Sequence, residues 1–190
     1  MTKAIFLDRD GTLIYDKHYV CSKEKFELIP NVIKGLKLLQ ESNFLLIITT
    51  NQSGVARGYF SEKELIDFNS WCISFFKESG ISISKIYYSP YLPGCKIKKY
   101  DIISNTRKPG LGMYIKAKKD FNIDFTKSFS IGDKITDCSF GYLGLGKSFL
   151  IEKNEKEETI KKVQERKYYN TFYEDCFFNA ALEILKENGK

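Results

Sequence analysis

Two aspartates separated by one residue follow the first apolar run of the chain. Residues 3–8 are predicted to form a buried strand, and Arg9, Asp10 and Gly11 come directly after Asp8. One carboxylate of such a pair can attack phosphorus, while the other protonates the leaving oxygen and later deprotonates water. Taken alone, the motif also fits an Asp-Gly turn, whereas its spacing does not fit an EF-hand calcium loop. Asp8 and Asp10 are therefore candidate catalytic residues.

A second polar motif ends the next apolar run. Residues 44–50 are predicted to form a buried strand, and the segment from Thr49 to Gly54 supplies a hydroxyl and backbone N–H groups that suit a phosphoryl oxygen. An ordinary Asn/Ser/Gly turn is the alternative here.

Further along the chain, Lys108 precedes Pro109 and could place its ammonium against the same phosphoryl group. The alternative for Lys108 is a solvated base in the loop that opens a helix.

A further polar motif, residues 132–137 (Gly-Asp-Lys-Ile-Thr-Asp), follows another predicted strand. Asp133 and Asp8 together would supply hard oxygen ligands for Mg²⁺. Asp137 comes four positions after Asp133, which places it on the same helical face, where it could anchor the site from behind. Alternatively, Asp133 caps a helix and Asp137 is a surface acid. All the motifs follow predicted strands, and the carboxyl ends of parallel strands are where such sheets bind ligands.

Apolar runs and helical periodicities alternate along the chain. The predicted strands are residues 3–8, 44–50, 85–89, 128–132 and 147–151. The predicted helices are 31–42 with Asn31 as its cap, 61–79 opened by a capping box of Ser61 and Glu64, 109–121 with Pro109 in its first turn, and 134–143. The remaining segments are an irregular stretch at 90–108, a charged helix or loop at 154–166, an edge strand at 168–173 and a terminal helix at 180–187. This alternation predicts an α/β fold with a parallel sheet and helices on both faces.

Composition bounds the class of protein. The chain has 190 residues, a net charge of +6 and five scattered cysteines. We expect one domain over residues 1–190, with reduced thiols. No apolar run suits a membrane span and the first residues do not form a signal peptide, so we expect a cytoplasmic protein. We also expect a monomer. Spread-out lysines favour a solvated surface and no nucleic-acid partner. Only four arginines occur, and the motif segments hold three that could grip an oxyanion: Arg9, Arg57 and Arg107.

These motifs resemble, in order, the four signatures of the haloacid dehalogenase superfamily of phosphohydrolases. The matching residues are Asp8-x-Asp10-Gly11-Thr12, Thr50, Lys108 and Gly132-Asp133-x-x-x-Asp137. The resemblance implies a three-layer, Rossmann-like fold, with Asp8 as nucleophile and Asp10 as general acid and base. It implies that Asp8, Asp133 and the carbonyl of Asp10 hold Mg²⁺. It also implies that Thr50 and Lys108 stabilise the phosphoryl group.

A narrower resemblance covers residues 3–151. Segments 6–12, 50–58, 107–109 and 132–134 are similar to D-glycero-D-manno-heptose 1,7-bisphosphate phosphatases, relatives of histidinol-phosphate phosphatase without a large cap domain. This resemblance implies removal of the 7-phosphate of that sugar bisphosphate during synthesis of activated heptose for surface glycans. The residues that it implies for substrate binding are Asp16, His18, Tyr19, Asn51, Gln52, Ser53, Arg57, Arg107 and Lys134.

One segment departs from that family, whose members usually carry a Cys-x-His and Cys-x-Cys zinc loop before the Arg-Lys-Pro motif. A single thiol, Cys95, lies in this segment and cannot replace four ligands. We therefore predict no structural zinc and expect Tyr91, Leu92 and Pro93 to hold the loop by packing. The positions that correspond to the zinc ligands are Ser89, Tyr91, Ser104 and Thr106.

Two other hypotheses stay open. The first keeps the chemistry but changes the substrate to histidinol phosphate, another small sugar phosphate or a 3′-phosphorylated polynucleotide. The second is a domain that binds phosphate or Mg²⁺ without turnover. Asp10 argues against this second hypothesis, because a purely binding role does not require an acid/base carboxylate.

Overall fold

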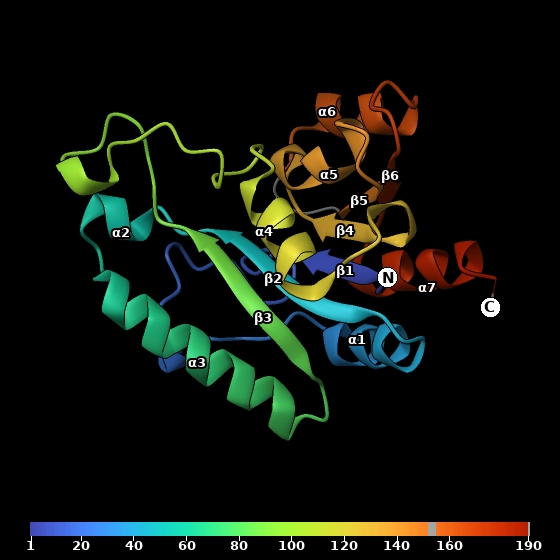
Figure 1. The fold of residues 1–190 in the computed structure, drawn as a ribbon, viewed down its shortest axis with the longest axis horizontal. Coiled ribbons are helices and arrows are strands. Elements are labelled where there is room, and N and C mark those ends of the chain that lie inside the picture. The colour runs from blue at the N-terminus through green and yellow to red at the C-terminus, as the bar shows by residue number, and fades with distance from the viewer. Residues whose placement is uncertain (152–154, 190) are drawn as a thin grey trace.

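A six-stranded parallel sheet forms the centre of the molecule (Figure 1). The structure, a computed structural model, describes residues 1–151 and 155–189. The strands are β1 (Ala4–Leu7), β2 (Leu45–Asn51), β3 (Ile83–Ser89), β4 (Phe129–Gly132), β5 (Lys147–Ile151) and β6 (Thr171–Glu174). Their order in the sheet is β3-β2-β1-β4-β5-β6. The order reverses between β1 and β4, and open parallel sheets bind ligands at such a switch point.

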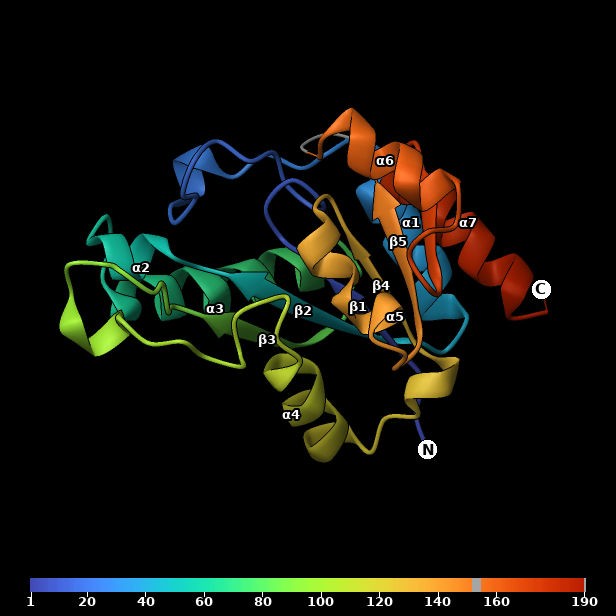
Figure 2. The same ribbon diagram turned by 90° about the horizontal axis from the view of Figure 1, so that it is seen from above.

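Helices cover both faces of this sheet, so the predicted three-layer α/β fold is confirmed (Figures 1 and 2). The helices are α1 (Val32–Glu41), α2 (Gly54–Arg57), α3 (Glu62–Glu78), α4 (Gly112–Phe121), α5 (Ser139–Tyr142), α6 (Glu157–Gln164) and α7 (Phe177–Glu187). Successive side chains of β1 point to opposite faces of the sheet, as in any strand. Ile5 and Leu7 pack with α1, α3 and α7, whereas Phe6 packs with Tyr114 and Phe140 of α4 and α5.

The ends of two predicted helices behave differently. The capping box of α3 is confirmed, because the Ser61 hydroxyl accepts from the Glu64 N–H and the Glu64 carboxylate accepts from the Ser61 N–H. The predicted side-chain cap of α1 is wrong. Asn31 stands before this helix in the left-handed region, with φ of 64°, and its side chain makes no capping hydrogen bond.

Helix α4 begins three residues later than predicted, at Gly112, so Pro109 is not in its first turn. Asn105 holds the chain in a turn instead: its side chain accepts from the N–H of Leu111 and its carbonyl from the N–H of Gly112. A Cβ atom at Gly110 would lie 2.3 Å from the Asn105 carbonyl oxygen, so this turn requires glycine. These local hydrogen bonds outweigh the preference of proline for a helix start.

The predicted helix 134–143 is also wrong as a single element. It is a 3-10 helix at Ile135–Cys138 followed by the short α5. The Asp137 carboxylate accepts from the Lys134 N–H at 3.0 Å, which satisfies one N–H of this tight first turn. Helix α2 was not predicted, because four residues show no periodicity.

The C-terminal region agrees with the prediction in kind. Strand β6 lies at the edge of the sheet, α6 lies within the charged segment 154–166, and α7 starts three residues before the predicted terminal helix. Residue 154 lies outside the described residues. In the described part of the chain, no helix is both long enough and apolar enough to cross a membrane.

Candidate active site

The predicted site residues meet at the carboxyl ends of the strands around the switch point. Asp8 follows β1, Thr50 lies near the end of β2 and Asp133 follows β4. They face a cavity of about 300 Å³. The lining residues are Asp8, Asp10, Asp16, His18, Tyr19, Thr50, Asn51, Gln52, Ser53, Arg107, Lys108, Asp133, Lys134, Thr136 and Asp137.

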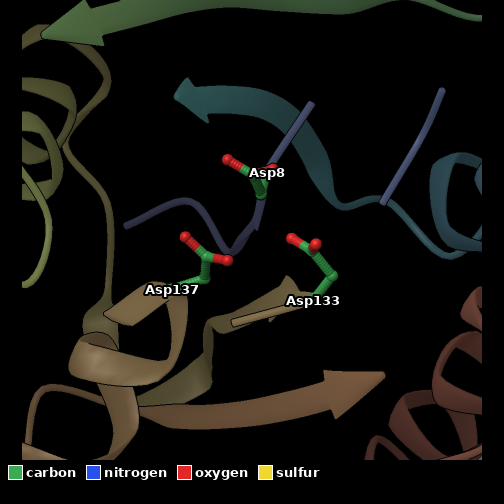
Figure 3. A group of neighbouring side chains, drawn as sticks. All are labelled: Asp8, Asp133 and Asp137. Carbon is green, nitrogen blue, oxygen red and sulfur yellow. The ribbon is translucent and has the colours of Figure 1, made fainter. Parts of the chain in front are cut away.

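Three buried carboxylates form the acidic centre of this cavity. Asp8, Asp133 and Asp137 point toward one another, and each offers an oxygen within 4.8 Å of the others (Figure 3). Burial raises the pKa of Asp8 well above its usual value; Lys108 opposes this shift, whereas Asp137 and Asp133 add to it. A divalent cation would offset the crowding of negative charge and keep Asp8 ionised. Hard carboxylate oxygens in this arrangement fit Mg²⁺.

The ammonium of Lys108 is fixed by three acceptors. Its Nζ atom lies 2.6 Å from Asp8 Oδ1 and 2.6 Å from Asp137 Oδ1, and it donates to the carbonyl of Thr49 at 2.7 Å. Burial alone would lower the pKa of Lys108, but the charges of Asp137 and Asp8 outweigh it and raise the pKa. Lys108 therefore remains protonated, with its three N–H groups directed by the protein.

Asp137 supports this lysine from behind. Its Oδ1 atom pairs with Lys108, its Oδ2 atom accepts from the Lys134 N–H, and its carbonyl accepts from the Tyr114 hydroxyl at 3.1 Å. A Cβ atom at position 132 would lie 2.1 Å from Asp137 Cβ, so Gly132 is required for this close approach. Both carboxylate oxygens of Asp137 are engaged by the protein, which leaves Asp8 and Asp133 as the better placed cation ligands.

Asp10 lies beside this cluster and is held by two side chains. The guanidinium of Arg9 donates to both carboxylate oxygens, from Nε to Oδ1 at 3.2 Å and from Nη2 to Oδ2 at 2.9 Å. The amide of Gln52 donates to Asp10 Oδ2 at 2.6 Å and to Thr50 Oγ1 at 2.9 Å. Arg9 does not line the cavity, so it does not grip a substrate oxyanion there.

Asn51 connects two of the motifs. Its side-chain amide donates to the carbonyl of Lys108 at 3.1 Å, and its Oδ1 accepts from the N–H of Lys108 at 3.0 Å. This reciprocal pair fixes the backbone of Lys108 to the end of β2. Contact between Asn51 and substrate stays a prediction, as it does for the other residues that the resemblance implied.

The loop after the first motif forms one side of the cavity mouth. Asp16 accepts from the N–H of His18 at 3.0 Å and lies 3.7 Å from Lys134 Nζ. His18 and Tyr19 both adopt left-handed backbone conformations, with φ of 58° and 60°. Non-glycine residues rarely adopt this region, and such strain concentrates at functional sites.

Two arginines lie close to each other beside Tyr19. Burial lowers the pKa of Arg107, and the charge of Arg57 lowers it further. Arg57 does not line the main cavity; it lines a neighbouring one together with Tyr59, and its guanidinium lies 5.8 Å from the ring centre of Tyr19. Arg107 donates to the carbonyl of Tyr91 at 3.2 Å. Two guanidinium groups thus lie close to each other near the cavity, whose lining otherwise holds five aspartates.

Hydroxyl groups hold the segment that corresponds, by the family resemblance, to a zinc loop. Thr106 Oγ1 lies 2.8 Å from Ser104 Oγ and donates to Ser89 Oγ at 3.2 Å. We call Ser89, Ser104 and Thr106 the hydroxyl cluster. Packing by Tyr91 and Leu92 against the apolar group around Tyr100 was predicted and is present, whereas the hydroxyl cluster was not predicted. The absence of zinc stays a prediction.

Two contributors to the site were missed by the sequence analysis. Thr136 lines the cavity but belongs to no recognised signature. Arg9 was considered only as a group that could grip an oxyanion, and its contacts with Asp10 were not foreseen. The available signal was an arginine directly after a predicted buried strand in a chain rich in lysine, because a guanidinium that becomes buried requires a fixed acceptor.

Comparison with known proteins agrees with this geometry. The family model described as polynucleotide kinase 3 phosphatase matches residues 3–176. A D-glycero-alpha-D-manno-heptose-1,7-bisphosphate 7-phosphatase of Campylobacter jejuni is 38% identical over 157 residues, which is 82% of this chain and 86% of the relative. The corresponding beta-heptose enzyme of Haemophilus ducreyi is 44% identical over 136 residues, which is 71% of this chain and 74% of the relative.

A solved structure shares the fold. It is a D,D-heptose 1,7-bisphosphate phosphatase from B. bronchiseptica complexed with magnesium and phosphate, with a TM-score of 0.79 and 23% identity. The match covers 98% of this chain and 99% of that one. The chain therefore belongs to the polynucleotide kinase 3 phosphatase family and is a phosphatase of the haloacid dehalogenase type.

Proposed function

We propose that this phosphatase hydrolyses a phosphate monoester through a phosphorylated Asp8 and uses Mg²⁺. The observation that carries the proposal is the buried pair of Asp8 and Lys108, joined at 2.6 Å, beside Asp133 at the switch point of the sheet. A nucleophilic carboxylate, a fixed ammonium and a second carboxylate are the groups that phosphoryl transfer through an aspartyl phosphate requires.

The reaction has two steps. Asp8 attacks phosphorus and forms a new O–P bond while the P–O bond to the leaving group breaks, and the leaving oxygen takes a proton from Asp10. Water then attacks phosphorus and gives a proton to Asp10 as the bond to Asp8 breaks. Inorganic phosphate is released and both carboxyl groups return to their starting states.

The residues around Asp8 stabilise the transferring group. Lys108 is charged and directed before substrate arrives, so no reorganisation is needed when negative charge moves onto the phosphoryl oxygens. Thr50 lines the cavity with its hydroxyl held by Gln52. Asp8, Asp133 and the backbone carbonyl of Asp10 would hold Mg²⁺, which when bound supplies the positive charge that offsets the phosphate dianion.

We propose that the substrate is D-glycero-D-manno-heptose 1,7-bisphosphate and that its 7-phosphate is removed. The names of the curated relatives support this substrate class. A bisphosphate needs a second cationic group away from Asp8, and Arg107 and Lys134 line the same cavity, with Arg57 close by. These bases would bind the phosphate that stays on the sugar.

The experiment is a phosphate-release assay with Mg²⁺ on both anomers of the heptose bisphosphate. Histidinol phosphate, heptose 7-phosphate and a 3′-phosphorylated oligonucleotide are assayed in parallel. We expect the highest kcat/KM on one of the bisphosphates. A higher kcat/KM on the oligonucleotide would replace the substrate proposal with the polynucleotide hypothesis, and no release from any ester, including an aryl phosphate, would leave a binding domain.

A further inference from the structure

Arg9 is buried directly beneath the proposed acid/base and makes contacts that the reaction scheme does not use. Its side chain is 1% exposed. Besides both oxygens of Asp10, its guanidinium donates from Nη2 to the carbonyl of Val20 at 2.7 Å and from Nη1 to Asn69 Oδ1 at 3.1 Å. The ring of Phe68 lies 5.1 Å from its central carbon. Arg9 thus joins three separate segments of the chain.

We infer that Arg9 is a positioning residue that orients the Asp10 carboxylate for proton transfer, an inference that rests on the proposed function of Asp10. The planar guanidinium matches a carboxylate with two parallel hydrogen bonds, which sets the direction of both oxygens. A lysine at this position would keep the charge but lose the fork. The residue type therefore points to orientation and not to charge alone.

The hydrogen bonds to Asp10 leave one direction open for chemistry. An ionised carboxylate has about four acceptor positions. Within the described residues, Arg9 takes one position on Oδ1 and one on Oδ2, and Gln52 takes a second on Oδ2. Asp10 lines the cavity and its side chain is 18% exposed. The remaining position on Oδ1 is thus the one available to a leaving oxygen or a water molecule.

The same guanidinium nitrogen links the acid/base to the cavity mouth. Nη2 of Arg9 donates both to Asp10 and to the carbonyl of Val20. Val20 directly follows His18 and Tyr19, the two residues with left-handed backbone. Arg9 therefore ties the strained loop at the mouth to the carboxylate that must meet the leaving group.

The test compares two leaving groups in the variant Arg9→Lys. An alkoxide needs a proton as it departs, whereas nitrophenolate does not, and kcat/KM reports only steps up to phosphorylation of Asp8. Both glycerol 1-phosphate and p-nitrophenyl phosphate are small and lack the heptose. We expect kcat/KM to fall about 10²-fold on the alkyl ester but less than about threefold on the aryl ester, since acid catalysis contributes about 10²–10⁴-fold.

Three further variants make the outcome decisive. Asp10→Asn sets the largest leaving-group effect; if it hydrolyses the alkyl ester normally, the proposed function of Asp10 fails, whatever Arg9 does. Asn69→Ala removes one anchor of Arg9 while keeping its fork on Asp10, and we expect a smaller loss that is again confined to the alkyl ester. Arg166→Lys makes the same chemical change far from the site, where Arg166 lies over the ring of Phe172.

Thermal unfolding monitors whether each variant folds. If Arg9→Lys does not fold, Asn69→Ala carries the test alone. Equal losses on both esters, or no loss on either, would overturn the positioning role of Arg9 and leave it a structural residue. A loss confined to the alkyl ester would support the inference, because a purely structural defect has no reason to distinguish leaving groups.

Discussion

The cavity has two regions that are built in different ways. We call Asp8, Lys108, Asp133 and Asp137 the floor, and Asp16, His18, Tyr19, Arg57, Arg107 and Lys134 the rim. The floor residues are buried, and Lys108 Nζ lies 2.6 Å from Oδ1 of both Asp8 and Asp137. The rim lies on loops and α2, with Tyr19 39% exposed. The comparison indicates that strand ends and buried ion pairs position the floor, whereas the rim is built mainly from loops, where binding residues are often found.

The largest expected effect is at the nucleophile of the floor. Asp8→Asn replaces the proposed nucleophile with an amide that does not form the acyl phosphate. We expect kcat on p-nitrophenyl phosphate to fall at least about 10⁴-fold, as for other catalytic nucleophiles. Asp16→Asn at the rim makes the same chemical change and should alter only KM for the sugar substrate. Ordinary turnover by Asp8→Asn would remove the distinction between floor and rim.

The next effect is on stability. Lys108→Met leaves Asp8 and Asp137 buried beside Asp133 without their lysine, and breaking a buried pair costs about 3–5 kcal/mol. Urea unfolding without Mg²⁺ measures this loss. Lys99→Met is the control, because Lys99 is exposed and pairs with Glu62 at the surface, where ion pairs contribute at most about 1 kcal/mol. Similar losses in both variants would contradict the buried floor.

A smaller effect is expected at the rim. Arg107→Gln and Arg57→Gln each remove a cation that we propose binds the phosphate left on the sugar, and charged hydrogen bonds contribute about 1.5–3 kcal/mol. We expect KM for the heptose bisphosphate to rise about tenfold, or about 1.4 kcal/mol, with kcat little changed. Steady-state kinetics measure both constants, with p-nitrophenyl phosphate as the control substrate. A collapse of kcat on that aryl ester would place these arginines in the chemistry.

The smallest effect is expected at the hydroxyl cluster. Thr106→Val keeps the shape of the side chain but removes the hydroxyl that joins Ser89 and Ser104. Loss of such hydrogen bonds costs about 1 kcal/mol each, so the urea midpoint should fall slightly. Turnover of p-nitrophenyl phosphate should not change. An unchanged midpoint would show that packing alone holds this loop.

The floor could be predicted from sequence because its position follows from a simple rule. The motifs of Asp8, Thr50 and Asp133 come at the ends of apolar runs, and a parallel sheet gathers such ends at one edge. Asp8 and Asp133 therefore converge although 125 positions separate them in the numbering. The predicted helix at 134–143 was wrong, but Asp137 was still correctly expected beside the site. Gly132 permits its close approach in the 3-10 helix.

The rim and the surroundings of Asp10 could not be predicted in this way. His18 and Tyr19 adopt left-handed backbone conformations, and the Tyr19 ring lies 5.8 Å from the Arg57 guanidinium; no local sequence pattern predicts either feature. Arg9 donates a hydrogen bond to Asn69, a buried residue of α3 that is 60 positions away in the sequence. The start of α4 depended on Asn105, whose hydrogen bonds compete with the helix preference of Pro109. These contacts depend on tertiary structure, which short sequence patterns do not encode.

The hydroxyl cluster determines how sensitive this loop is to pH, oxidants and chelators. Hydroxyl groups do not titrate at ordinary pH, do not react with peroxides and hold no metal that a chelator could remove. Thiolates that bind a metal, by contrast, can be protonated, oxidised or stripped of the metal. The segment beside the cavity mouth is fastened by Ser89, Ser104 and Thr106. These three hydroxyl groups therefore offer nothing for a peroxide to oxidise or for a chelator to remove.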